Sequence, residues 1–70
     1  MSATLVDARG LRCPWPVVRL ARALREDGAP VTIVADDPLA NTEIAAFATA
    51  TGCSVILEET EIGTGWRVDR

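Results

Sequence analysis

The middle of the chain reads Pro30-Val31-Thr32-Ile33-Val34-Ala35-Asp36-Asp37-Pro38. Residues 30–35 are almost all apolar, which is typical of a strand in the middle of a sheet. Asp36-Asp37-Pro38 then ends the strand and favours the start of a helix, because an acidic residue can cap a helix and proline fits its first turn. This stretch therefore predicts a central strand that leads directly into a helix.

Two helical patterns flank the central strand, each with apolar residues at spacings of three and four. The first pattern ends at Gly28, and its inner face consists of Val17, Leu20, Ala21 and Leu24. The second ends at Gly52, and its inner face consists of Ile44, Phe47, Ala48 and Thr51. This periodicity predicts two amphipathic helices that pack on the sheet through one face each.

Three further strands complete the predicted fold. Residues 3–8 form the first and are stopped by Arg9-Gly10, residues 54–61 form the third, and residues 66–69 form the last after a turn over 62–65. The order β-α-β-α-β-β predicts an α+β fold, a two-layer α/β sandwich with a mixed four-stranded sheet and two helices on one face. Residues 1–70 contain no linker or repeat, so we expect a single domain.

Composition excludes several classes of protein and several kinds of catalytic chemistry. The 70 residues are 49% hydrophobic and 24% charged, which is ordinary for a soluble globular protein. Residues 1–4 lack the basic start and apolar core of a secretory signal, and no apolar run approaches the length of a membrane span, so we expect a cytoplasmic protein. The chain has no His and no Lys, which removes the usual general bases and Schiff-base nucleophiles. Two Cys without His cannot build a four-ligand zinc site, so we expect no metal.

The topology also predicts where the cysteines lie. Right-handed β-α-β crossovers place the starts of both helices at one edge of the sheet, so Cys13 and the Asp36-Asp37 pair should share that edge. Cys53 follows the second helix and should lie at the opposite edge. A helix of roughly 12 residues is about 18 Å long, and a disulfide needs Cα atoms within about 7 Å. We therefore expect no disulfide between the two cysteines.

The stretch Cys13-Pro14-Trp15-Pro16 is the strongest candidate for chemistry. A residue before proline is disfavoured in helical geometry, which suits Cys13 to a cap-like position, with Pro14 in the first helical position. The N–H groups of Trp15 and Val17 and the helix dipole then favour a thiolate at Cys13, with possible help from Arg9 and Arg12. The alternative is an inert, buried thiol.

The run Leu5-Val6-Asp7-Ala8-Arg9-Gly10-Leu11-Arg12-Cys13-Pro14-Trp15-Pro16-Val17 resembles the TusA/SirA-type sulfur-carrier family, which has a Cys-Pro-x-Pro motif after a strand and a Gly-Leu turn. Asp36-Asp37-Pro38-Leu39-Ala40, Ile44, Phe47-Ala48 and Gly52 continue the resemblance, which spans nearly the full chain. Two departures are Arg where relatives often have Lys along the first helix, and Cys53 where many have His or another polar residue.

The resemblance implies a persulfide carrier, acting with partner enzymes and not an enzyme itself. Cys13 receives sulfane sulfur from a cysteine desulfurase or a rhodanese-type sulfurtransferase and passes it to an acceptor protein. Known outlets of the family are tRNA thiolation, molybdenum-cofactor maturation and sulfur oxidation. The persulfide on Cys13 is transient, and no separate cofactor is expected. The residues expected to support the motif and the anion are Gly10, Arg12, Pro14, Trp15 and Pro16.

Charge and exposure indicate how partners could dock. Residues 1–25 carry five Arg and one acid, whereas residues 26–70 carry two Arg and nine acids, a polarity that suits steered docking to a protein. The candidate docking residues are Asp36, Asp37, Arg19 and Arg22, with Trp15 filling a partner pocket. The alternatives are a solvated helix face for the arginines, a helix cap for one aspartate, and loop packing for Trp15. The acidic chain makes direct nucleic-acid binding unexpected, and we expect no membrane partner.

Two other functions remain open from the residues alone. A one-cysteine thiol redox protein would form a sulfenic acid at Cys13. A regulatory protein- or RNA-binding module would use the sandwich itself and leave Cys13 without a role.

Overall fold

Four strands and two helices follow one another along residues 4–70, the residues described by the computed structural model. They are β1 (Thr4–Asp7), α1 (Trp15–Asp27), β2 (Val31–Val34), α2 (Ala40–Thr51), β3 (Ser54–Thr60) and β4 (Gly63–Asp69). This order confirms the predicted β-α-β-α-β-β arrangement. Ala3, which was expected to begin the first strand, lies outside the described residues.

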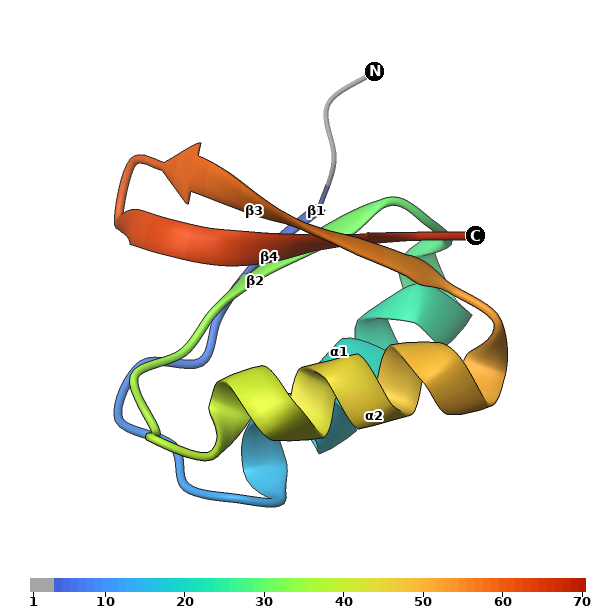
Figure 1. The fold of residues 1–70 in the computed structure, drawn as a ribbon. Coiled ribbons are helices and arrows are strands. Elements are labelled where there is room, and N and C mark those ends of the chain that lie inside the picture. The colour runs from blue at the N-terminus through green and yellow to red at the C-terminus, as the bar shows by residue number, and fades with distance from the viewer. Residues whose placement is uncertain (1–3) are drawn as a thin grey trace.

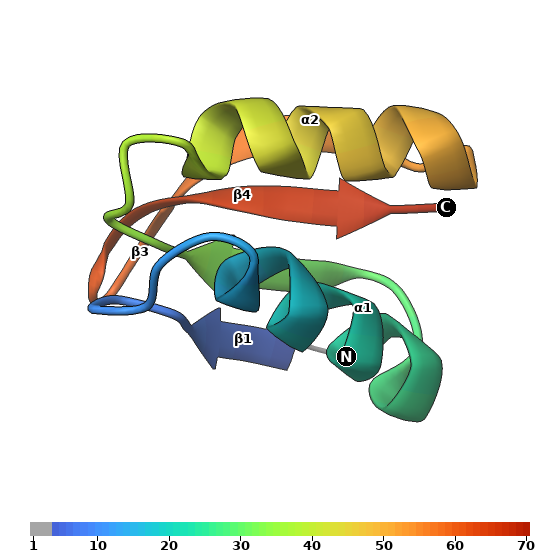
Figure 2. The same cartoon turned by 90° about the horizontal axis from the view of Figure 1, so that it is seen from below.

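The sheet is mixed, and β2 lies inside it. The strand order is β1-β2-β4-β3, with β1 parallel to β2 and β4 antiparallel to both β2 and β3. Both helices cover one face of the sheet, which Figures 1 and 2 show from two directions. The predicted two-layer sandwich with a central apolar strand is therefore confirmed. No helix within residues 4–70 is long and apolar enough to cross a membrane.

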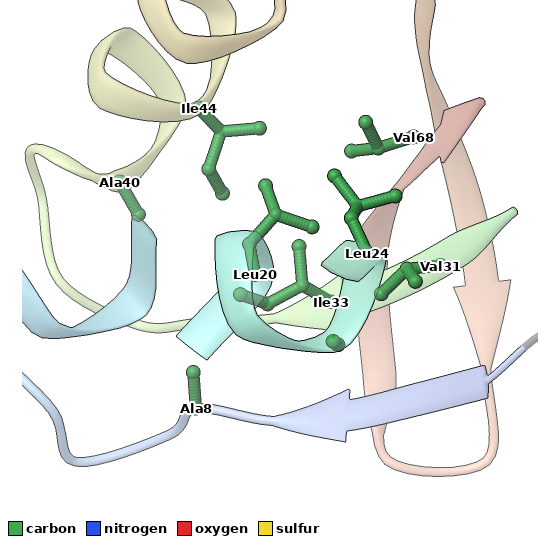
Figure 3. Close-up of a cluster of buried hydrophobic side chains, with 9 residues drawn as sticks. Ala8, Leu20, Leu24, Val31, Ile33, Ala40, Ile44 and Val68 are labelled. Carbon is green, nitrogen blue, oxygen red and sulfur yellow. The ribbon is translucent and has the colours of Figure 1, made fainter. Parts of the chain in front are cut away.

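The core lies between the helices and the two inner strands. Leu20 of α1 and Ile44 of α2 are fully buried against Ile33 of β2, and Figure 3 shows side chains from both helices converging on β2 and β4. Burying one such side chain stabilises a fold by about 1.5–3 kcal/mol. Because both helices depend on the same few strand residues, this core fixes where each helix begins relative to the other.

On both helices, the residues predicted at the centre of the inner face are buried, whereas those predicted at its margins are not fully buried. Leu20 and Leu24 of α1 are buried, whereas Val17 and Ala21 are only half-buried; Pro16 and Ala23 are buried in addition. In α2, Ile44 and Ala48 are buried and Phe47 is half-buried.

Thr51, predicted on the inner face of α2, is exposed. Its hydroxyl donates to the Phe47 carbonyl oxygen over 2.8 Å. The helix thus satisfies this polar group locally at its last turn, and the core does not need it.

Two element boundaries differ from the prediction. Helix α1 begins at Trp15 with Pro14 as its N-cap, so Pro14 is not the first helical residue. Strand β4 begins at Gly63 and not at Trp66, because Thr60 pairs with Gly63 and leaves a two-residue turn. The sheet pairing extends the strand into glycine-rich sequence that has little strand propensity of its own. Gly28 and Gly52 follow the two helices as the predicted C-caps.

Gly65 allows β4 to approach the end of β2. A Cβ atom at this position would lie 2.5 Å from the Ile33 carbonyl oxygen and 2.9 Å from Cγ2 of Val34. Gly65 is buried, so the neighbouring backbone has little freedom to withdraw. Glycine at position 65 is therefore required by the sheet itself.

We predict that Gly65→Ala lowers the free energy of unfolding by about 1–3 kcal/mol, because the added methyl group overpacks a backbone contact. Urea denaturation followed by circular dichroism measures this change. Ile56→Val, at an exposed position of β3, serves as control and should change stability by less than about 0.5 kcal/mol. Equal stability of the alanine variant and the wild type would contradict the proposed close packing.

Candidate functional site

Two loops lie side by side at the edge where the parallel strands β1 and β2 end. Residues 8–14 connect β1 to α1, and residues 35–39 connect β2 to α2. Figure 1 shows both loops beside the starts of the two helices. The predicted meeting of Cys13 with the aspartate pair at this edge is thus correct, and it follows from the parallel pairing of β1 with β2.

Asp36 and Asp37 bind the backbone of the Cys13 loop. The Gly10 N–H donates to Oδ1 of Asp36 over 2.9 Å, and the Cys13 N–H donates to Oδ2 of Asp37 over 2.7 Å. Asp37 also accepts from the Leu39 N–H through Oδ1 at 3.4 Å. One carboxylate therefore connects the Cys13 loop to the turn that begins α2.

The expectation that one aspartate caps the second helix is wrong. The N-cap of α2 is Leu39, and no side chain caps this helix. The physical reason is that amides of the neighbouring loop lack a partner in the sheet, and the carboxylates satisfy them instead. Such charge-assisted hydrogen bonds are stronger than neutral ones, so they hold the loop firmly.

Cys13 lies half-buried in a small pocket between the starts of the two helices. The space in this pocket is too small to hold a water molecule, and its other lining residues are Pro14, Pro16, Val17, Asp37, Ala40 and Glu43. The proline rings and Ala40 make one side apolar, whereas the carboxylates of Asp37 and Glu43 make the other side acidic. The sulfur is therefore partly shielded from water and lies close to negative charge.

This environment opposes a thiolate and corrects the sequence-based expectation. Burial raises the pKa of the Cys13 thiol, and the charge and hydrogen bond of Glu43 and the charge of Asp37 raise it further. The Trp15 N–H, one of the expected anion donors, is used by the Arg12 carbonyl oxygen at 2.8 Å. Burial and the two carboxylates thus both disfavour a thiolate at Cys13.

Glu43 was not identified from the sequence. It is half-buried, and it lies in the first turn of α2, where acidic residues are common for reasons of helix stability alone. The predicted topology could have identified Glu43, because both helices start at the same edge of the sheet and the first turn of α2 therefore lies beside Cys13.

The two arginines of the loop do not supply positive charge to the sulfur. Arg9 binds Asp7 through two side-chain hydrogen bonds of 2.9 Å each. Arg12 is exposed and lines a separate depression with Gly10, Asp36 and Asp37. Gly10 has a φ of 82°, which makes it suited to the turn that brings its amide to Asp36.

The remaining motif residues divide between surface and core. Pro16 is buried beneath the start of α1, Pro14 is exposed, and the Trp15 side chain is 58% exposed. Leu39, at the start of α2, is 54% exposed. Large apolar side chains thus reach solvent from the starts of both helices.

Arg19 and Arg22 lie outside the Cys13 pocket. Both are exposed on α1 and line a groove along the edge strand β1. The Nε atom of Arg22 lies 3.2 Å from Oε2 of Glu26, one turn further along the helix. Tertiary structure therefore separates these candidate docking residues from Gly10, Arg12, Cys13 and the aspartate pair.

We predict that the two aspartates protect different amides. Asp37→Ala should accelerate hydrogen exchange of the Cys13 amide by on the order of tenfold, because the loss of one hydrogen bond is worth about 1 kcal/mol. Asp36→Ala should do the same for the Gly10 amide. NMR measures the exchange rate of both amides in both variants, so each variant is the control for the other. Equal acceleration of the two amides in either variant would contradict separate roles for the two aspartates.

We also predict a low-pH titration of Asp7. Hydrogen bonds from Arg9 lower the pKa of Asp7 from 3.8 to about 2. A carboxyl group with a lowered pKa in the folded state stabilises the fold above pH 4 and loses this contribution as the pH falls towards 2. Because the pair is exposed, the effect on stability is small.

The Asp7 titration is measured from its carboxyl carbon resonance. Arg9→Gln should return the midpoint towards 3.8, whereas Arg12→Gln should leave it at about 2. A wild-type midpoint near 3.8 would show that the pair does not persist in solution.

Comparison with known proteins agrees with the fold of the chain. A family model described as Sulfurtransferase TusA matches residues 4–68. The crystal structure of a SirA-like protein from Desulfitobacterium hafniense is similar to this chain with a TM-score of 0.75 and 28% sequence identity, and the match covers 93% of this chain and 95% of that chain. With its family model matched over almost the whole length and its fold shared with a SirA-like protein, the chain belongs to the TusA sulfurtransferase family.

Proposed function

We propose that this protein is a persulfide carrier in which Cys13 holds the transferred sulfur. The observation that supports this most is the position of Cys13, which lies half-buried between the starts of the two helices while its amide is held by Asp37 at 2.7 Å. The TusA family has a general sulfur-carrier role, and its members work in sulfur relay with partner proteins. Cys53, by contrast, follows the end of α2 in the chain and is partly buried against the core.

The transfer needs no external oxidant or reductant. The Cys13 sulfur attacks the terminal sulfur of a donor persulfide, a new S–S bond forms, and the S–S bond of the donor breaks. The electron pair of the broken bond stays on the donor sulfur, which takes up the proton that Cys13 releases. Donor persulfide and Cys13 thiol thus become donor thiol and Cys13 persulfide, with every atom and electron accounted for.

The carrier depends on partner enzymes for activation. The chain contains no His or Lys, and the charged groups that face Cys13 are carboxylates, which disfavour its thiolate. We propose a cysteine desulfurase or a rhodanese-type sulfurtransferase as donor, because both present a persulfide on their own cysteine. The acceptor is a protein of tRNA thiolation, molybdenum-cofactor maturation or sulfur oxidation, and we place the exchange in the cytoplasm.

The surface around Cys13 supports docking of a protein. Trp15 and Leu39 expose apolar side chains at the starts of the two helices, and such groups form the centres of protein interfaces. Asp36 is exposed beside them, while Asp37 is half-buried and serves the loop. Arg19 and Arg22 would meet a partner only if its contact extends along α1 to the groove beside β1.

We predict that sulfur loading requires Cys13 alone. Incubation with a cysteine desulfurase and L-cysteine should add the mass of one sulfur atom to the wild type, and reductant should remove it. Cys13→Ser should show no gain, because a hydroxyl group does not form a persulfide. Cys53→Ser is the matched control and should load like the wild type. Intact-protein mass spectrometry measures all three.

A rhodanese with thiosulfate is the second donor in this experiment. Loading by either donor that is lost only in Cys13→Ser supports the carrier role, and the donor that succeeds names the class of partner. Loading that persists in Cys13→Ser, or failure of the folded wild type with both donors, would overturn the proposal. A sulfenic acid formed at Cys13 on peroxide treatment, with turnover of a reductant, would instead favour the thiol redox function.

A further inference from the structure

Glu43 is the carboxylate that faces the Cys13 sulfur from the other helix. It belongs to the first turn of α2, is half-buried, and lines the same small pocket as Cys13. The charge of its side chain raises the pKa of the Cys13 thiol. The two residues are thirty positions apart in the sequence and meet only because both helices begin at one edge of the sheet.

The other charged groups near Cys13 are engaged elsewhere. Both oxygens of Asp37 accept backbone amides, from Cys13 and from Leu39, and Asp36 accepts the Gly10 amide. Arg9 is held by Asp7. The loop of Cys13 contributes Arg12, which is exposed and lines a different depression. Of the two carboxylates that line the Cys13 pocket, Asp37 is therefore committed to backbone amides, and Glu43 is the one left beside the sulfur.

We propose that Glu43 controls the protonation of Cys13, holding the unloaded carrier as a neutral thiol until a partner neutralises or displaces this carboxylate. The inference rests on the proposed carrier function and specifies how its reactive residue is regulated. Only the thiolate form of cysteine reacts readily with oxidants and alkylating agents. A carboxylate beside the sulfur thus protects the carrier between transfers.

The same contact gives the released proton a path. When Cys13 attacks a donor persulfide, its proton passes to the Glu43 carboxylate, which can return it to the donor sulfur that leaves. The Cys13 thiol and the donor persulfide remain the only sulfur species consumed, and Glu43 ends in its starting state. A cationic side chain of a partner, brought next to Glu43, would cancel its charge and favour the thiolate during docking.

The test is the pH dependence of alkylation of Cys13 by iodoacetamide in the Cys53→Ser background. We expect the midpoint to fall by about one pH unit in Glu43→Gln, because a like charge within about 4–6 Å shifts a pKa by this amount or more. Glu43→Lys, which imitates the charge of a cationic partner, should lower the midpoint further. Glu26→Gln removes the same charge near the far end of α1, about 16 Å along the helix from its first residue, Trp15, and should leave the midpoint unchanged.

The plateau rate at high pH separates protonation from packing. If Glu43 only filled space, the isosteric Glu43→Gln would leave the midpoint where it is, and Glu43→Ala would raise the plateau through easier access without moving the midpoint. This pair of results would overturn the proposal. An unchanged profile in a variant shown to be folded by circular dichroism would also overturn it. Because alkylation uses no sulfur donor, a midpoint shift without persulfide loading would refute the carrier function and leave the control by Glu43 standing.

Discussion

The hydrogen bond from the Cys13 amide to the Asp37 carboxylate, 2.7 Å long, is the constraint on which the site depends. The parallel pairing of β1 and β2 brings the two loops to one edge, and the core beneath α1 and α2 fixes the starts of both helices. Neither of these determines the path of the loop itself. The bonds to Asp36 and Asp37 do so, because they supply partners for loop amides that the sheet leaves unpaired.

The use of carboxylates to hold the Cys13 loop has an electrostatic consequence. Carboxylates are strong acceptors for backbone amides, but they also bring negative charge to within reach of the sulfur. With Glu43 added on the opposite side, the pocket raises the pKa of Cys13 and disfavours the anion that sulfur transfer requires. The isolated protein therefore has a well-defined loop and a quiescent thiol, a combination that suits a member of a family whose proteins act together with partners.

Two arginines of α1 lie away from the edge that holds Cys13. Arg19 and Arg22 lie along the groove beside β1, and Arg22 is paired with Glu26. At the edge itself, Trp15 and Leu39 expose apolar side chains beside the carboxylates. A partner that covers this edge thus meets apolar side chains together with carboxylates and the exposed Arg12, and the uneven charge of the protein steers the partner's approach.

The sequence alone determined the element order, the central position of β2, the inner residues Leu20, Leu24, Ile44 and Ala48, and the edge shared by Cys13 and the aspartates. These follow from local periodicity and from the handedness of crossovers. It did not determine the start of β4, which depends on pairing with β3, or the acceptor roles of Asp36 and Asp37, which look like helix caps until the neighbouring loop is present. The protonation of Cys13 was decided only by tertiary structure. The local sequence at the start of α1 favours a thiolate. Burial and Glu43, which is thirty residues away in the chain but close in space, instead raise the pKa of Cys13.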